Sequence, residues 1–413
     1  MTATENDAIA ARPTDWASRP PQTPQQWVER ASEVAAILAT DAVRRDHEGK
    51  TPYAEIQLLK DAGLVTLLGP AEFGGGGQNW TTAYRVIREI ATGDGSIGQL
   101  VGYHYLWAWA ARLVATPEQI AFVEEQATVN KWFFGGAVNP RDNDLTIVDE
   151  GDTIVYNGRK SFSTGSKVSD VTVLEGVLEG TEKHIFAIVP SKQDGIVFND
   201  DWDNLGQRLT ESGSVAITDV RVPWEQAAGY VDKEFVPRVY NTLNVPLIQL
   251  VFTNFYLGIA KGALATATTY TRDRTRPWPY SVDVKGAAAE EFYILETYGD
   301  LQSKLWAAEA LAERAADAIE RINEHPDTTT PQERGEAAVI IAAAKQRAID
   351  TGLEIGTKIF EVTGARASAN SVGLDLFWRN IRTHSLHDPI AHKRAEVGRY
   401  ALLGEVPEPT WYT

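Results

Sequence analysis

The hydrophobic periodicity of this 413-residue chain changes twice, and these changes constrain its fold more than any other feature. From about residue 25 to 127, apolar residues recur every three or four positions, as on one face of a helix. Between residues 131 and 222 the period falls to two, in short β-branched and aromatic runs typical of strands. From about residue 236 the helical period returns in units longer than an average helix. A doubly wound parallel sheet is excluded, because no long helical pattern separates the strand runs.

These patterns predict an α+β chain with a middle antiparallel β domain and a C-terminal four-helix bundle. The predicted strands cover residues 131–137, 145–148, 153–157, 171–177, 184–190 and 214–222. The predicted bundle helices cover residues 239–274, 288–323, 331–364 and 389–403. We expect four parts: a flexible tail (1–24), a helical domain (25–130), a β-barrel domain (131–235) and a helical bundle domain (236–413).

Charge and composition exclude several classes of function. The chain has 39 basic and 56 acidic residues, a net charge of −17, which argues against a nucleic-acid partner. It has no cysteine, so disulfides, thiolate metal sites and cysteine nucleophiles are excluded. No apolar run approaches the ~18 residues of a membrane span, and the N-terminus lacks the pattern of a secretion signal. We therefore expect a soluble cytoplasmic protein that contacts no membrane.

Two short motifs allow more than one interpretation. Residues 93–98 (GDGSIG) match a dinucleotide-binding pattern, but a helix precedes them, so Gly93 and Ser96 are better explained as helix caps. His384 and His387 lie three residues apart beside Arg379 and Arg382. The arginines disfavour a metal pair, and we predict no metal site. Spacing alone favours a hydrogen-bonded turn, while a proton-donating pair remains the alternative.

Five stretches along the chain resemble the acyl-CoA dehydrogenase fold. They are residues 70–75 (PAEFGG), 94–96 (DGS), 157–165 (NGRKSFSTG), 205–208 (LGQR) and 219–223 (DVRVP). A closer resemblance is to the dibenzothiophene monooxygenases, a flavin monooxygenase branch of that fold. It rests on residues 102–104 (GYH), 199–202 (NDDW), 210–214 (TESGS), 256–260 (YLGIA), 276–278 (RPW), 377–380 (FWRN) and 384–389 (HSLHDP).

This resemblance implies a two-component monooxygenase. Such an enzyme takes reduced FMN, in preference to FAD, as a co-substrate from a separate NAD(P)H:flavin reductase. Oxygen then adds to the flavin C4a carbon, and the resulting hydroperoxide oxygenates a heteroatom. The implied substrate is an aromatic or heterocyclic sulfur compound, converted to a sulfoxide and a sulfone. The resemblance also implies a homotetramer assembled through the bundle.

The resemblance also assigns roles to individual residues. The implied catalytic residues, at the reactive edge of the flavin, are His104, His387, His384 and Thr164. The implied cofactor-binding residues are Phe162, Ser163, Thr164, Trp202, Arg276 and Arg366. The two arginines would hold the cofactor phosphate, with Arg276 reaching from a neighbouring subunit. The implied substrate-binding residues are Tyr103, Trp107 and Gly136.

One departure from the family pattern leaves the substrate open. The relatives carry an Asn-Ala-Ser-Ser-Glu-Asn-Asn run where this chain has Gly136 followed by residues 137–142 (AVNPRD). The loss of the amide puts dibenzothiophene itself in doubt. The alternatives are a flavin-dependent N-hydroxylase of an amine or amino sugar, an FAD acyl-CoA dehydrogenase, and a helical scaffold without activity. The dehydrogenase is disfavoured because His387-Asp388-Pro389 stands where its catalytic glutamate is expected.

Overall fold

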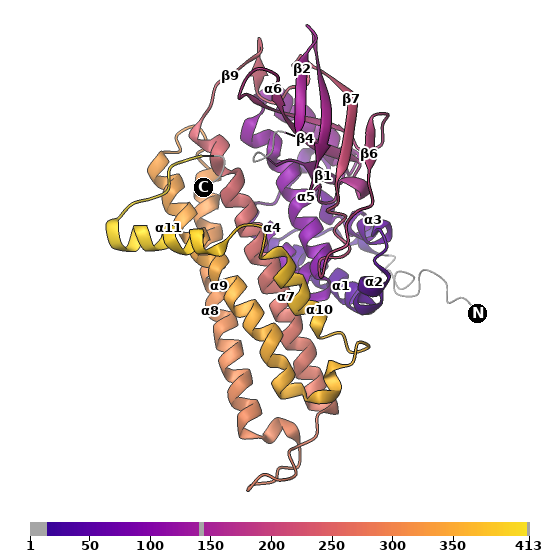
Figure 1. Ribbon diagram of the computed structural model, residues 1–413, viewed down its shortest axis with the longest axis vertical. Coiled ribbons are helices and arrows are strands. Elements are labelled where there is room, and N and C mark those ends of the chain that lie inside the picture. Colours follow the sequence, from indigo (N-terminus) through magenta and orange to yellow (C-terminus); the bar gives the residue numbers. More distant parts are fainter. Residues whose placement is uncertain (1–14, 140–143, 411–413) are drawn as a thin grey trace, which may run out of the picture.

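The computed structural model of this chain describes residues 15–139 and 144–410. Its first part is a layer of helices, and the central helix is α5, which is buried along most of its length (Figure 1). The side chain of Asp94 accepts hydrogen bonds from the amides of Ser96 and Ile97, so Asp94 caps α5, and not Ser96 as predicted. The helices are α1 (Pro24–Ala39), α2 (Ala42–Glu48), α3 (Tyr53–Asp61), α4 (Trp80–Gly93), α5 (Gly95–Val114) and α6 (Pro117–Val129), with short 3-10 turns η3 (Leu64–Thr66) and η4 (Ala71–Phe73) between α3 and α4.

Part of the segment predicted as a flexible tail is packed against the protein. Residues 1–14 lie outside the described residues, but Trp16 forms a 3-10 turn, η2 (Trp16–Ser18), and is 4% exposed. The guanidinium of Arg30 lies 5.4 Å from the centre of the Trp16 ring, and Trp16 Nε1 donates to Glu33. The prediction of a flexible tail failed here because burying the large Trp16 ring orders a segment whose other residues are mostly polar or proline.

The middle part is a seven-stranded sheet in the order β1-β4-β2-β3-β7-β6, with β5 paired to β4. The prediction of an antiparallel domain needs correction, because β4 pairs in parallel with both β1 and β2. The prediction also began the first strand three residues too early and missed β6. The strands are β1 (Phe134–Ala137), β2 (Leu145–Asp149), β3 (Thr153–Lys160), β4 (Val171–Leu178), β5 (His184–Pro190), β6 (Ile196–Phe198) and β7 (Val215–Pro223), followed by a hairpin of β8 (Tyr230–Val231) and β9 (Glu234–Phe235).

The C-terminal part is built on three long helices that run side by side away from the sheet (Figure 1). They bury rows of leucine, isoleucine and alanine against one another, and α4 packs on α7 and α8. Two shorter helices, α10 and α11, pack on α9. The helices are α7 (Asn244–Arg274), preceded by the turn η7 (Val239–Leu243), α8 (Phe292–Asn323), α9 (Pro331–Thr363), α10 (Asp375–His384) and α11 (Ile390–Leu403). The boundaries between the predicted domains stay a prediction.

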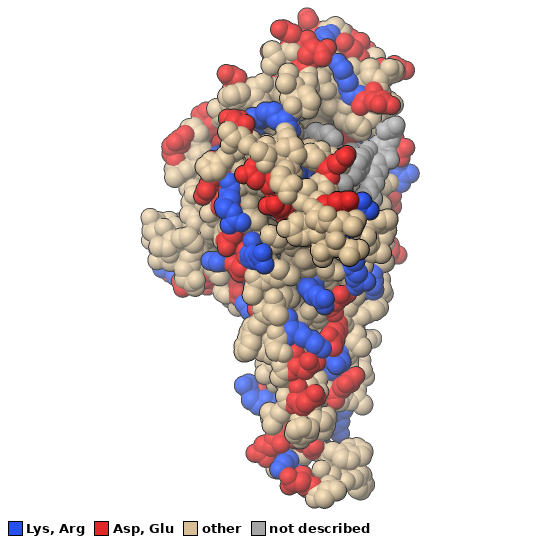
Figure 2. Space-filling view, turned by 90° about the vertical axis from the view of Figure 1, so that its left-hand side faces the viewer, with Lys and Arg blue, Asp and Glu red and all other residues tan. Residues whose placement is uncertain are grey.

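One described helical segment, Val239–Arg274, is long and apolar enough to cross a membrane by composition, with a mean hydropathy of 1.4. However, 83% of its most apolar window is buried inside the protein, where it contacts α4, α5 and α9. A buried core helix passes the same test of composition. The surface of the bundle carries basic and acidic side chains side by side (Figure 2).

Candidate active site

Two backbone groups occupy both ring nitrogens of His104, a residue of α5 that is 1% exposed. Nε2 lies 2.8 Å from the carbonyl oxygen of Val65, and the amide of Phe134 donates to Nδ1 over 3.0 Å. Because a carbonyl can only accept, Nε2 carries the proton. Burial lowers the pKa of His104 to about 4, so the ring is neutral. Both ring nitrogens thus have backbone partners, and the ring joins η3 to β1; a catalytic role for His104 stays a prediction.

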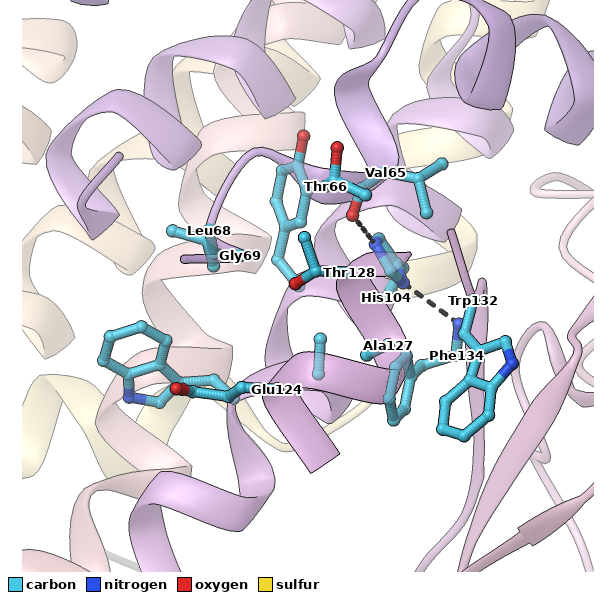
Figure 3. A pocket seen from close by; sticks show the side chains of 13 residues that line it. Val65, Thr66, Leu68, Gly69, His104, Glu124, Ala127, Thr128, Trp132 and Phe134 are labelled. Atoms are coloured by element: carbon cyan, nitrogen blue, oxygen red, sulfur yellow. Dashed lines mark hydrogen bonds between the residues drawn. The ribbon is translucent and has the colours of Figure 1, made fainter. Parts of the chain in front are cut away.

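A small pocket lies beside His104, between η3, α5, α6 and the segment that leads into β1 (Figure 3). Trp132 and Phe134 line it. Of the aromatic residues of α5, Tyr105 and Trp109 line it, whereas Tyr103 and Trp107 do not. The predicted substrate-contacting residues of α5 therefore face away from this pocket.

His384, the last residue of α10, lies between two tyrosines. Its Nδ1 is 2.7 Å from the hydroxyl of Tyr256 on α7, and its Nε2 is 3.2 Å from the hydroxyl of Tyr103 on α5. Phe252 and Phe255 pack against its ring, with centroids 4.5 and 4.7 Å away. Burial holds the pKa of His384 well below its usual range, and the nearby His387 and Lys345 lower it further. His384 is therefore a neutral bridge between hydroxyl groups.

His387 is the open member of the histidine pair, with a side chain that is 48% exposed. Its ring stacks on that of His384 at 5.6 Å, and its Nδ1 lies 3.2 Å from Asp388 Oδ1. The same carboxylate oxygen lies 2.5 Å from Nζ of Lys345, a residue of α9 that is 1% exposed. If Nδ1–H donates to Asp388, then Nε2 of His387 faces outward. This arrangement lets His387 hold or deliver a proton at Nε2.

Opposing effects act on the buried ion pair of Lys345 and Asp388. Burial by itself raises the pKa of Asp388, but the hydrogen bond with His387 and the charge of Lys345 outweigh it, so the pKa lies well below its usual range. Burial lowers the pKa of Lys345, and Asp388 partly offsets that effect. Asp388 is therefore held as a carboxylate and is a poor proton acceptor. This argues against the dehydrogenase alternative, in which Asp388 would replace the catalytic glutamate.

A second group of predicted residues surrounds the turn after β3. Phe162 has a left-handed backbone, with φ of 56°, and its side chain is among the exposed large apolar ones, at 68%. The ring of Trp202 meets it edge to face at 6.3 Å. Next to it, the hydroxyls of Ser163 and Ser166 are buried and have no partner among the described residues. An exposed aromatic face beside unpaired buried hydroxyls is suited to a flat polar ring such as a flavin.

The hydroxyl of Thr164 is the outer end of a chain of hydrogen bonds. Thr210 Oγ1 donates to the carbonyl of Gln207 over 2.9 Å, so the 2.7 Å bond between Ser212 and Thr210 must use the proton of Ser212. The 2.8 Å bond between Thr164 and Ser212 must then use the proton of Thr164. The amide of Thr164 donates to the carbonyl of Phe162. In this arrangement the hydroxyl proton of Thr164 is used within the chain of hydroxyls, and its oxygen is left as an acceptor; the role of Thr164 at the flavin stays a prediction.

The loop that carries this chain of hydroxyls is attached to the helix that carries His384. The amide of Gln207 donates to Oδ1 of Asn380 over 2.7 Å, and Asn380 lies one turn before His384 on α10. At Gly206 there is no room for a side chain, because a Cβ would lie 2.2 Å from the carbonyl oxygen of Arg379. The loop of the hydroxyl chain and the helix of the histidine pair thus pack directly against each other, through Gly206 and Gln207 on one side and Arg379 and Asn380 on the other.

Gly136 and Trp107 touch at the edge of the sheet nearest to α5. A Cβ added to Gly136 would lie 2.3 Å from Cε2 and 2.4 Å from Nε1 of the Trp107 indole. Trp107 Nε1 is buried and has no hydrogen-bond partner among the residues that the structure describes. Pro140, which follows in the departing run, lies outside the described residues. The glycine that distinguishes this chain therefore accommodates the indole ring.

Arg276 and Arg366, the predicted phosphate ligands, lie together at the end of the bundle far from the sheet. Both side chains are exposed. The ends of α7 and α9 are joined there, since Thr275 Oγ1 donates to the carbonyl of Thr363 over 3.0 Å. Arg276 follows Tyr256 by 20 residues, which is about 30 Å along a helix. Within one chain, these arginines are not brought to the histidine pair.

Sequence reasoning missed two residues of this site, Tyr256 and Lys345, and did not identify Asp388 as the counter-ion of a buried lysine. Lys345 gave a usable signal, because it is a charged residue inside the apolar run of residues 337–344 (AAVIIAAA), at a core-facing position of α9. A lysine in such a place requires a buried counter-ion. The sequence did not identify which carboxylate serves, since Lys345 and Asp388 are 43 residues apart.

Comparison with known proteins gives one consistent result. Residues 22–123 match the family "Acyl-CoA dehydrogenase, N-terminal domain", and residues 250–391 match "Acyl-CoA dehydrogenase, C-terminal domain". Dibenzothiophene monooxygenase of Rhodococcus erythropolis is 37% identical, over 96% of this chain and 97% of its own. A Pseudomonas putida protein, "Probable FMNH2-dependent monooxygenase SfnC", is 38% identical, over 93% of this chain and 96% of its own.

Solved structures agree with these relatives. Methanesulfinate monooxygenase MsuC from Pseudomonas fluorescens superposes with a TM-score of 0.89 and is 39% identical, covering 94% of this chain and 99% of its own. TdsC from Paenibacillus sp. A11-2, solved with FMN and indole, has a TM-score of 0.89 and is 35% identical, covering 94% of this chain and 100% of its own.

Proposed function

Because this chain belongs to the dibenzothiophene monooxygenase family of the acyl-CoA dehydrogenase fold, we propose that it is a two-component, FMN-dependent monooxygenase that oxygenates sulfur. The names of its relatives support each part: one is FMNH2-dependent, one was solved with FMN, and two are named for sulfur compounds. One observation carries the proposal. The exposed histidine His387, which can hold a proton, is bonded to Asp388, a carboxylate whose low pKa makes it a poor base.

The residues present fit an FMN ring between two groups: the residues around Phe162 and Trp202, and the histidine pair. Phe162 and Trp202 would cover the isoalloxazine, and the unpaired hydroxyl of Ser163 and the acceptor oxygen of Thr164 would contact its polar edge. Bound in its reduced form, FMN would supply the electrons that activate O2. His387 would hold a proton at Nε2 for the oxygen that leaves as water, and the surrounding aromatic side chains would exclude bulk water.

The remaining partners are part of the same proposal. A separate NAD(P)H:flavin reductase would supply the reduced FMN, and O2 and a small aromatic or heterocyclic sulfur compound would be the other reactants. Tyr103, Trp107 and Gly136 would contact that compound. A cytoplasmic location stays a prediction.

The direct test is a reconstituted reaction. The purified chain is incubated with FMN, NADH and a flavin reductase, and with a panel of thioethers, thiophenes, indole, sulfinates and amines, and mass spectrometry measures oxygen gain. We expect oxygen gain on sulfur compounds that disappears without the reductase. Oxygen gain on amines alone would indicate an N-hydroxylase, and oxidation of an acyl-CoA by tightly bound FAD would indicate a dehydrogenase; either result would reject the proposal.

The distal end of the bundle supports assembly into a homotetramer. Four large apolar residues after α7 are exposed, beside Arg276: Trp278, Tyr280, Val282 and Val284. Tan side chains gather at this lower end of the bundle (Figure 2). An exposed apolar patch of this kind is typical of a subunit contact. Since Arg276 lies far from the histidine pair of its own chain, it would hold the phosphate of an FMN bound to a neighbour.

Replacing Arg276 tests this arrangement. Arg276→Ala should weaken FMN binding about 10- to 100-fold, because a charge-assisted contact to the phosphate is lost. Fluorescence titration of FMN measures the change. Co-assembly with His387→Ala chains should restore part of the oxygenation, because mixed tetramers then contain sites with an intact arginine and an intact histidine from different chains. Unchanged FMN affinity would reject the phosphate assignment, and no restoration would place both residues in one chain's site.

A further inference from the structure

The backbone of Gln207 is held in an uncommon conformation at the contact between the β domain and the bundle. Gln207 is 1% exposed and has a φ of 53°, in the left-handed region that glycine adopts readily and glutamine does not. A costly backbone conformation persists only where its surroundings fix it, and such residues are typical of functional sites. The contacts that fix Gln207 therefore indicate what this conformation serves.

The amide groups of Gln207 bind two helices. The backbone amide donates to Oδ1 of Asn380 over 2.7 Å, and Asn380 is 2% exposed. In the side chain, Nε2 donates to the carbonyl of Gly95 over 3.3 Å, and Oε1 accepts from Ser96 Oγ over 3.2 Å. These two residues begin α5, and Asn380 lies one turn before His384 on α10. Gln207 is thus bonded to the first turn of α5 and to the helix of the histidine pair.

The carbonyl of Gln207 organises the side chains that we place against the flavin. Its oxygen accepts from Nε1 of Trp202 over 2.8 Å and from the hydroxyl of Thr210 over 2.9 Å. Trp202 meets the exposed ring of Phe162 edge to face. Thr210 begins the chain of hydroxyls that ends at Thr164. One carbonyl oxygen therefore directs both the aromatic cover and the hydroxyl chain of the proposed FMN site.

We propose that Asn380 and Gln207 are positioning residues, which hold the flavin-facing side chains at a fixed place relative to the histidine pair. With its left-handed backbone, Gln207 presents its amide to Asn380 while its carbonyl binds Trp202 and Thr210. Asn380 acts on the cofactor through these two side chains. This inference rests on the proposed function, because the group that is positioned is FMN.

The two sides of the proposed site belong to different parts of the chain, so a contact must fix their separation. A proton donor must lie within hydrogen-bond reach of the atom that it serves, and a misplacement of about 1 Å slows a reaction strongly. A second contact lies beside the first: Arg379 donates to the carbonyl of Leu205 over 2.8 Å and pairs with the buried Asp46 at 2.7 Å. Loss of the Asn380 acceptor should therefore loosen the loop without separating the two parts.

Hydrogen exchange of the ligand-free chain tests this contact without any cofactor. Asn380→Leu keeps the size of the side chain but removes the acceptor of the Gln207 amide. Mass spectrometry should show that residues 199–212 exchange at least about tenfold faster than in the wild type, because opening this loop no longer breaks the bond to Oδ1. Unchanged exchange in this segment would overturn the proposal.

A matched variant controls for the loss of a buried asparagine. Asn241, in η7, is also 2% exposed, and its Oδ1 also accepts a backbone amide, that of Arg238. Asn241→Leu should leave exchange in residues 199–212 at the wild-type rate. An equal rise there in both variants would overturn the proposal, because it would show a general loss of stability.

Titration with oxidised FMN tests whether Asn380 acts through Trp202. Trp202→Phe keeps an aromatic ring but loses the N–H that binds the carbonyl of Gln207, and it should weaken FMN binding about fivefold. Asn380→Leu should weaken it about tenfold, and the double variant no further, because both changes release the same ring.

The double variant distinguishes a shared effect from two separate ones. Independent effects would multiply to about 50-fold, and this result would overturn the proposal. Unchanged affinity in Trp202→Phe would also overturn it. Trp202 is only partly buried, so this variant decides the question even where Asn380→Leu does not fold.

The two measurements separate this inference from the proposed function. Faster exchange of residues 199–212 in Asn380→Leu, in a chain that binds no FMN, would uphold the contact and reject the proposed function. Equal FMN affinity in the wild type, both single variants and the double variant would uphold the cofactor and reject the positioning residues.

Discussion

Replacing His387 by alanine should uncouple the enzyme: NADH and O2 are consumed, but hydrogen peroxide replaces most of the oxygenated product. The expected loss of product is about 100-fold or more, the typical contribution of a positioned proton donor. The reason lies in the geometry, since His387 is the open histidine of the pair, and its Nδ1 bond to Asp388 directs Nε2 outward. FMN affinity should stay at the wild-type value, because His387 belongs to a different cluster from Phe162 and Trp202.

The measurement is the ratio of product to hydrogen peroxide at equal NADH consumption. His392→Ala is the matched control, because His392 is an exposed histidine on the neighbouring helix α11, and it should leave the ratio unchanged. A wild-type ratio in His387→Ala would remove this residue from the mechanism. A parallel loss of FMN binding would show instead that the histidine helps to hold the cofactor.

The order of helical, β and helical parts was predictable because hydrophobic period depends on local geometry alone. The three long C-terminal helices were placed to within a few residues, since each buries a continuous apolar stripe. The parallel pairing of β4 with β1 and β2 was not predictable, because strand partners are chosen by the packing of the whole domain. The helical conformation of residues 375–384 was also missed, since this helix is short and most of its residues are polar.

For the candidate site, the sequence could name residues but not their hydrogen-bond partners. The motif around His104 predicted a catalytic histidine, and only the structure shows Val65 and Phe134 bonded to its two nitrogens. The direction of the proton in Thr164 depends on Thr210 and Ser212, which lie far along the chain. Donor and acceptor roles follow from three-dimensional partners, so motifs cannot supply them.

Lys345→Met should destabilise the protein strongly, by about 3–5 kcal/mol at neutral pH, because it leaves Asp388 as a buried carboxylate without its cation. Chemical denaturation monitored by fluorescence measures the free energy of unfolding. The double variant Lys345→Met/Asp388→Asn should recover part of this loss, since no uncompensated charge remains. A double variant as unstable as the single one would show that packing of the lysine stem, and not charge, is responsible.

The effect of Lys345→Met should also depend on pH with a defined sign. In the wild type the pKa of Asp388 is depressed on folding, so its contribution to stability is present above the unfolded pKa of about 3.9 and is lost as pH falls further. Without Lys345 only the hydrogen bond and charge of His387 oppose burial, the largest effect on Asp388, so its pKa rises and ionisation penalises the folded variant at neutral pH but not near pH 4. The stability difference between wild type and variant should therefore shrink from pH 7 to about pH 4. A constant difference over this range would show that Asp388 is not the partner whose charge Lys345 neutralises.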